Sequence, residues 1–328
     1  MIIESTFKPA WWLPNSHVQT IYPTLTRRIQ APVDLRERIE LPDGDFIDLA
    51  WAINGNNSKT PLVILLHGLG GNVQSSYVGG LMQAFNRYGW RAVLMHFRGA
   101  SEEPNRLLRA YHSGDTEDIN YLLNLLKQRE PSSKKAVVGI SLGGNVLLKW
   151  LGEQGQQSLI DAAVAVSVPF QLRLVADRIS QGFSRVYQGY LLRRLRQVFE
   201  QKKNNYTEDL PEVLQNIDKW QCFWTFDEFV TAPIHGFPNV HAYYRESSSR
   251  RYLRHIATPT LIIHALDDPF MTPEVLPQAD ELSSDITLEL SSSGGHVGFI
   301  SGKLPGKPLY WLEQRIPDYL QKIFAILH

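Results

Sequence analysis

The sequence is poor in cysteine. Its 328 residues contain one, Cys222, so no disulfide can form within the chain. A single cysteine is compatible with a reducing compartment, and we expect a cytoplasmic protein. Cys222 lies among aromatic residues in "WQCFW", with no strand-to-helix turn around it. We therefore expect a buried residue and not a nucleophile.

Long apolar runs and net charge are also missing. The longest uninterrupted apolar stretches, such as "LVILL" at Leu62–Leu66, are far shorter than the ~20 residues that span a bilayer. Glu4 stands where a signal peptide would carry its apolar segment. We expect neither a transmembrane segment nor a secretory leader. Lys+Arg and Asp+Glu balance at 33 each, which argues against nucleic acid as the main partner.

The periodicity of the chain predicts a mostly parallel sheet. Residues Arg36–Ile53 alternate and turn at "PDGD", as an antiparallel hairpin does. The later runs at 61–68, 90–99, 134–141, 161–170, 258–268 and 285–290 are apolar with little polar alternation, and helical patterns separate most of them. Such strands belong to a parallel sheet covered on both faces, with sites at the carboxyl ends of its strands.

One of the intervening helices is predicted in more detail. It follows "SGDT", where Asp115 or Thr116 can cap it, and Pro131 closes it. Its apolar face consists of Ile119, Leu122, Leu123 and Leu126.

The alternation of strands and helices stops between about Gln171 and Arg254. This stretch holds a helical pattern with a basic face around 193–203, followed by an aromatic, loop-like segment, "FWTFDEFVTAPIHGFPNVHAYYRESSS". About 80 residues are too many for a simple loop. We predict a core of residues 1–170 and 255–328, the former with an N-terminal arm and the hairpin, and a helical lid of residues 171–254. The basic helix could instead lie on a membrane surface, but a lid packed on its own core is the more economical account.

A serine between glycines is the strongest chemical signal. Gly139-Ile140-Ser141-Leu142-Gly143 fits G-x-S-x-G between a predicted strand and a predicted helix. Such a corner strains the serine backbone, raises its hydroxyl above the sheet and excludes a Cβ on the flanking residues. The hydroxyl needs a base oriented by a carboxylate. His296, in "SSSGGHVGF", and the pair Asp267-Asp268 each follow a strand, in the order of serine, acid and base that α/β-hydrolases use.

The remaining candidates have supporting or structural roles. The backbone N–H groups of Leu69, in "HGLGG", and of Leu142 are predicted to bind an oxyanion. We expect His67 to order its turn by hydrogen bonding, and His17 and Asp227 to make scaffold or lid contacts. His96 and His264 end apolar strands without neighbours at metal-ligand spacing, so we expect no metal.

Eight motifs carry a resemblance to a known family. They are "NSHVQTIYP", "HGLGG", "HFRGAS", "HSGDTEDI", "GISLGGN", "FDEFVTAPIHGF", "ALDDPF" and "GGHVGF". In order and wording they resemble the YheT-type branch of the α/β-hydrolase superfamily (AB hydrolase 4 family). This branch includes yeast medium-chain fatty acid ethyl ester synthase/esterases and membrane-bound lung-type α/β-hydrolases. The sequence departs from the animal members in lacking their N-terminal membrane anchor, which puts a membrane-lipid substrate in doubt.

The resemblance implies a serine carboxylic-ester hydrolase of the α/β-hydrolase fold. Related hydrolases read Asp-x-hydrophobic-x-Pro around the catalytic aspartate, which favours Asp268 over the alternative Asp267. The expected triad is Ser141, Asp268 and His296, with no cofactor. The aromatic residues Phe223, Trp224 and Phe226 suggest a small-molecule ester with an apolar acyl group, although they can equally form the core of the lid. Acyl transfer to an alcohol, or a catalytically silent ligand-binding protein, remain alternatives.

Overall fold

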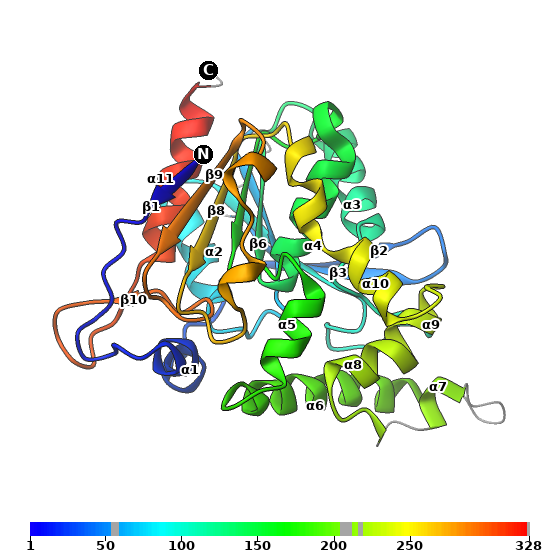
Figure 1. The fold of residues 1–328 in the computed structure, drawn as a ribbon. Coiled ribbons are helices and arrows are strands. Elements are labelled where there is room, and N and C mark those ends of the chain that lie inside the picture. The colour runs from blue at the N-terminus through cyan, green and yellow to red at the C-terminus, as the bar shows by residue number, and fades with distance from the viewer. Residues whose placement is uncertain (54–58, 204–211, 216–218, 327–328) are drawn as a thin grey trace.

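The computed structural model describes residues 1–53, 59–203, 212–215 and 219–326 (Figure 1). Within these residues lies a nine-stranded sheet of order β1-β9-β8-β7-β6-β4-β5-β3-β2. The strands are β1 (Ile2–Glu4), β2 (Leu35–Glu40), β3 (Phe46–Ala52), β4 (Leu62–Leu66), β5 (Arg91–His96), β6 (Lys135–Ile140), β7 (Ala162–Val166), β8 (Thr260–Ala265) and β9 (Ile286–Ser291). The β2–β3 and β3–β5 pairs are antiparallel and the others are parallel. The predicted hairpin and parallel sheet are confirmed.

Helices cover both faces of this sheet, as fully apolar strands require. Along β4, Leu62, Ile64 and Leu66 pack into one cluster with α3 (Glu117–Arg129) and α4 (Leu142–Gln154). The alternate residues Val63 and Leu65 pack into another with α2 (Val78–Arg87) and α11 (Leu312–Ile326). Successive side chains of a strand point to opposite faces, so each central strand contributes to two hydrophobic cores.

The α3 helix buries the apolar face predicted for it, but the prediction that a side chain caps this helix is wrong. Thr116 occupies the N-cap position without capping the helix, and its hydroxyl donates instead to Glu153 Oε2 at 2.7 Å. Asp115 accepts a hydrogen bond from Arg109 at 2.9 Å. Both side chains are used for tertiary contacts, which took precedence over the local cap.

Residues 171–254, called the inserted segment below, follow β7, and those of them that the structure describes are largely helical. They form α5 (Leu172–Ile179), α6 (Ser184–Lys203), α7 (Glu212–Gln215), α8 (Phe223–Phe226), a π-helical turn (Asp227–Thr231), α9 (Ala232–Ile234), α10 (Val240–Ser247) and a 3₁₀ helix (Ser249–His255). In Figure 1 α5, α6 and α8 gather at one end of the sheet, below it in this view. The prediction of a loop for the aromatic stretch is therefore wrong. No helix in the described ranges is long and apolar enough to cross a membrane.

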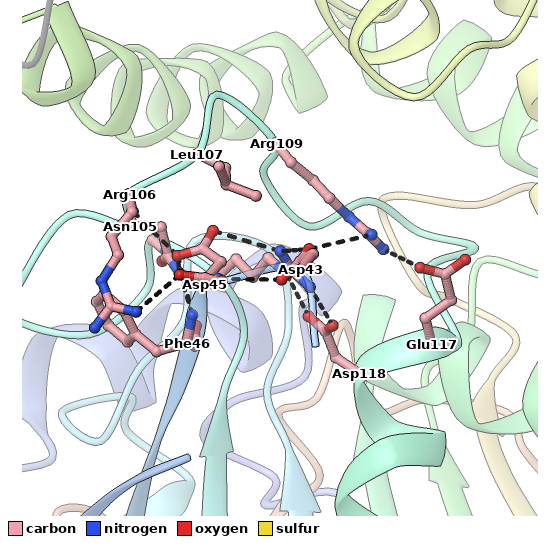
Figure 2. A network of polar contacts seen from close by, with 12 residues as sticks. Asp43, Asp45, Phe46, Asn105, Arg106, Leu107, Arg109, Glu117 and Asp118 are labelled. Atoms are coloured by element: carbon pink, nitrogen blue, oxygen red, sulfur yellow. Dashed lines mark hydrogen bonds and ion pairs between the residues drawn. The ribbon is translucent and has the colours of Figure 1, made fainter. Parts of the chain in front are cut away.

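A network of polar contacts surrounds Arg98, and the inserted segment lies against the loop beside it (Figure 2). The Arg98 guanidinium lies 2.6 Å from Asp43, 3.4 Å from Asp45 and 2.7 Å from Asp118. It thereby joins the turn of the β2–β3 hairpin to α3. From the inserted segment, the Lys202 ammonium donates to the carbonyl oxygens of Leu107 and Arg109, in the loop that follows β5.

The N-terminal arm forms elements that the sequence pattern did not predict. The β1 strand pairs with β9, Ile2 opposite Leu288. The α1 helix (Ser16–Thr26) begins at Asn15, whose side chain accepts hydrogen bonds from the N–H groups of His17 and Val18. A further two-stranded sheet joins β10 (Ile300–Ser301) to β11 (Leu309–Tyr310).

Candidate active site

Ser141 occupies a sharp turn between β6 and α4. Its backbone is left-handed, with φ at 53° and ψ at −115°, a strained conformation for a residue other than glycine. A Cβ on Gly139 would lie 2.5 Å from the Gly143 carbonyl oxygen, and one on Gly143 would lie 2.5 Å from that of Leu66. Both flanking positions therefore require glycine, because strand and helix backbones approach too closely for a side chain.

His296 connects Ser141 to Asp268. The His296 Nε2 atom is 3.0 Å from Ser141 Oγ, and Nδ1 is 2.7 Å from Asp268 Oδ2. Asp268 is buried. Burial alone would raise the pKa of Asp268, but the charge of the His296 imidazolium and its hydrogen bond hold this pKa below the usual value. The carboxylate is thus ionised at neutral pH and can stabilise a proton on the imidazole.

The two neighbouring aspartates have different hydrogen-bond partners. Asp267 does not take the place of Asp268 on His296: its Oδ1 accepts the Gly295 N–H at 2.9 Å. Asp268 also accepts the Phe270 N–H at 2.9 Å, which fixes its second oxygen. The carboxylate on the imidazole is therefore that of Asp268, and Asp267 holds the loop on which His296 lies.

Ser141 and His296 line a pocket that is open to solvent. The sites predicted to bind an oxyanion, Leu69 and Leu142, line the same pocket. Leu142 is the first residue of α4, where a helix leaves its N–H groups without intrahelical partners. Most of the other lining side chains are apolar and come from the inserted segment or the loop after β8: Leu172, Val175, Ala176, Ile179, Leu191, Phe223, Phe270 and Met271.

His67 is fully buried, and both of its ring nitrogens form hydrogen bonds with backbone groups. Nε2 accepts the Phe97 N–H at 3.1 Å, so Nδ1 carries the proton and donates it to the Gly68 carbonyl oxygen at 2.7 Å. Burial lowers the pKa of His67 to about 3. The ring orders its turn as a neutral group, in agreement with the structural role expected for it.

Of the other residues considered above, His17, His96, His264 and Cys222 are not among those that line the Ser141 pocket. His17 Nδ1 is 3.0 Å from the Tyr187 hydroxyl of α6, a contact between the arm and the inserted segment. His96 Nε2 accepts the Val73 N–H at 3.3 Å, and His264 packs near Phe170. Cys222 is half-buried, and not buried as expected, and it is the N-cap residue of the short α8 helix. The described part of the chain contains no group of His, Cys, Asp and Glu suited to a metal ion.

Asp227 is the carboxyl residue among those that line the pocket. The hydroxyls of Thr231 and Tyr244 donate to it at 2.7 and 2.8 Å, and burial raises its pKa to about 7. It thus makes the expected contacts within the inserted segment and also faces the space beside Ser141. Of the three aromatic residues predicted to contact an acyl group, Phe223 lines the pocket. Phe226 packs inside the inserted segment, and Trp224 donates to Asp177 at 2.8 Å.

Sequence reasoning missed the side chains that support His296. The Phe270 ring stacks on the imidazole, with ring centroids 4.0 Å apart and planes 10° apart. The Thr20 and Ser167 hydroxyls accept backbone N–H groups of His296 and Val297. Phe270 lies two residues after Asp268, so proximity in sequence was an available signal for it. Thr20 and Ser167 carried no local signal.

A glycine-flanked serine at a strand–helix turn, joined to a histidine and an aspartate from two later strand ends, defines an α/β-hydrolase. The comparisons agree: the family model of the alpha/beta hydrolase fold matches residues 61–303. A protein of Escherichia coli (strain K12) named "Putative esterase YheT" is 44% identical over 97% of this chain and 93% of its own length. The chain belongs to the α/β-hydrolase family, in its YheT-type branch.

Solved structures show the same fold at low identity. An esterase of Pyrococcus furiosus aligns with a TM-score of 0.56 and 18% identity, covering 88% of this chain and 90% of its own. A soluble variant of monoglyceride lipase from Saccharomyces cerevisiae, solved with a substrate analog, aligns with a TM-score of 0.55 and 13% identity, covering 91% and 98%. At these identities the likeness concerns the fold alone.

Proposed function

We propose that this protein, an enzyme of the carboxylic-ester hydrolase class, is a serine esterase with the triad Ser141, His296 and Asp268. The observation that carries the proposal is the continuous contact from Ser141 Oγ through the imidazole to the buried Asp268 carboxylate, at 3.0 and 2.7 Å. Nucleophile, base and orienting acid are then within hydrogen-bond reach of one another before any substrate binds.

The first half of the reaction forms an acyl-enzyme. Ser141 Oγ attacks the ester carbonyl carbon while its proton passes to His296 Nε2, and Asp268 stabilises the resulting imidazolium. The N–H groups of Leu69 and Leu142 bind the tetrahedral oxyanion, an interaction whose loss costs about 3 kcal/mol for one donor. The C–O bond to the alcohol then breaks, and the alcohol leaves with the proton from His296.

The second half releases the acid. His296 takes a proton from a water molecule as its oxygen attacks the acyl carbon, and returns that proton to Ser141 Oγ as the bond to the acid breaks. An alcohol in place of water would give a transesterified product. No cofactor is needed at any step.

The substrate class follows from the pocket. We infer a small ester with an apolar acyl group, because the side chains of α5, α6 and the loop after β8 give the pocket an apolar lining. We also propose that residues 171–254 act as the lid of a core formed by residues 1–170 and 255–328, since α5, α6 and α8 supply that lining. The lid residues belong to the same pocket as Ser141.

A fluorophosphonate probe tests the nucleophile. The wild type should become labelled, and Ser141→Ala should not. Ser132→Ala, which changes an exposed serine, is the matched control and should label like the wild type. Equal labelling of Ser141→Ala and wild type would contradict the proposal. Hydrolysis of p-nitrophenyl esters of graded acyl length, with and without an added alcohol, then measures chain preference and separates hydrolysis from acyl transfer.

A further inference from the structure

The loop that carries His296 has a strained backbone. Val297 and Phe299 both have positive φ values, of 63° and 42°. A left-handed backbone is unusual for any residue except glycine and is a clear outlier for a β-branched one such as Val297. Such strain persists only where the surrounding structure fixes the conformation. Contacts outside the loop must therefore hold it in place.

Three side chains from distant parts of the sequence make those contacts. Three consecutive N–H groups, those of residues 295–297, each donate to a side-chain oxygen. They are Gly295 to Asp267 Oδ1 at 2.9 Å, His296 to Thr20 Oγ1 at 2.9 Å and Val297 to Ser167 Oγ at 3.1 Å. The backbone on both sides of the His296 side chain is thus fixed in position.

The middle contact comes from α1, in the N-terminal arm, and the helix packs directly on the loop. A Cβ on Gly295 would lie 2.5 Å from the Ser16 carbonyl oxygen and 2.7 Å from Thr20 Oγ1. The Thr20 hydroxyl donates its own proton to that Ser16 oxygen at 2.8 Å. Its orientation is therefore set, and its lone pairs face the His296 N–H.

A buried glutamine ties the same helix to the far end of the loop. Gln19 is fully buried, and its Nε2 donates to the carbonyl oxygens of Leu13 and Ile300 at 2.9 and 3.0 Å. Its Oε1 accepts the Ile300 N–H at 2.7 Å. Because these bonds lie inside the protein, α1 cannot shift without leaving polar groups unsatisfied.

The helix also reaches the imidazole ring through the inserted segment. His17 Nδ1 is 3.0 Å from the Tyr187 hydroxyl of α6. The Tyr187 ring lies 4.8 Å from that of Phe270, which in turn stacks on His296. The backbone and the ring of His296 are therefore both held by contacts that begin on α1, and the side chains of Thr20 and Tyr187 are themselves hydrogen-bonded to each other.

We propose that α1 is a positioning element of the active site, and that Thr20 is the positioning residue that sets the His296 backbone. This inference rests on the proposed role of His296 as the base. Thr20 acts through the His296 N–H: without its oxygen the strained loop loses its central anchor and the imidazole shifts relative to Ser141 Oγ. A misplacement of about 1 Å can cost ~10²-fold in rate, and with two anchors remaining we expect a loss of about tenfold.

The test compares Thr20→Val, Thr20→Ser and Thr26→Val. Valine keeps the shape of threonine but removes the acceptor, and serine restores it. Thr26 is the matched control because its hydroxyl donates to the Tyr22 carbonyl oxygen four residues earlier, as Thr20 does to Ser16, but lies on the exposed part of α1. Active sites are counted by fluorophosphonate titration, so that a loss of folded protein does not count as a loss of rate.

We expect the kcat per titrated site of Thr20→Val to fall about tenfold with KM nearly unchanged. Thr20→Ser should recover most of the rate, and Thr26→Val should match the wild type. A Thr20→Val rate per site equal to the wild type, or a Thr20→Ser variant as slow as Thr20→Val, would overturn the inference.

A second measurement does not depend on activity. The proton between His296 Nδ1 and Asp268 should give a low-field ¹H NMR signal that Thr20→Val broadens or shifts and Thr20→Ser restores. An identical signal in wild type and Thr20→Val overturns the inference even if the probe labels Ser141. A wild type that resists the probe but shows the Thr20-dependent signal contradicts the proposed esterase function alone.

Discussion

The sharpest test of the site exchanges each of the two adjacent aspartates for asparagine. In Asp268→Asn the amide group can donate to His296 Nδ1, which forces the proton onto Nε2, the nitrogen that must accept from Ser141 Oγ. The geometry survives, but the base is lost. The same change in a serine protease triad lowers kcat ~10⁴-fold, which corresponds to about 5.4 kcal/mol at ~1.36 kcal/mol for each factor of ten.

Asp267→Asn is the matched control. Asparagine retains a carbonyl oxygen that can accept the Gly295 N–H, so the loop keeps its anchor. We expect a loss of less than about tenfold, since a neutral hydrogen bond contributes about 1 kcal/mol. Both variants are assayed with p-nitrophenyl butyrate, with kcat given per fluorophosphonate-titrated site in the wild type and Asp267→Asn. A rate for Asp268→Asn above one tenth of the wild type, or an equal loss in both variants, would refute the assignment.

Two further predictions concern stability. Burial raises the pKa of Asp227 to about 7 from 3.8, so the native state binds its proton more tightly than the unfolded state and loses stability as the pH rises through this interval. Asp227→Asn should remove this loss, which is at most about 4 kcal/mol over the whole interval and about 3 kcal/mol between pH 5 and pH 8. Urea unfolding at these two pH values measures it, and an unchanged pH dependence would contradict it. Arg98→Met leaves buried carboxylates without their cation and should cost about 3–5 kcal/mol. The exposed Arg106–Glu40 pair makes Arg106→Met the control, with a much smaller loss expected in the same unfolding assay because solvent screens this pair.

The sequence was most informative where structure depends on neighbouring residues. Apolar strands and the glycines around Ser141 follow from steric rules within a few residues, and the structure has them as predicted. The aromatic stretch after residue 222 was wrongly predicted to be a loop, because Pro233, Gly236 and Pro238 are residue types typical of turns. Pro233 instead lies in the first turn of α9, where a missing N–H is harmless, and Gly236 follows the end of that helix.

Contacts between distant residues left no such pattern. The β1 strand has three residues, too few to show a period, and its partner β9 lies more than 280 positions away. A threonine inside "HVQTIYP" looks like any other helical threonine. Only the folded chain shows that its oxygen meets the N–H of His296.

This difference has a physical consequence for the site. Ser141 is held mainly by its own neighbours, since it lies in the turn between a strand and a helix, and its N–H donates to the Val166 carbonyl oxygen of the adjacent strand β7. His296 instead lies in a loop whose strained backbone is held by residues 20, 167 and 267. Its position is therefore a property of the whole fold, and small disturbances of the N-terminal arm should reach the base before they reach the nucleophile. Phosphonylation of Ser141 and turnover of ester both need the base. Both rates should therefore fall together in a variant of the N-terminal arm, while the turn that holds Ser141 remains intact.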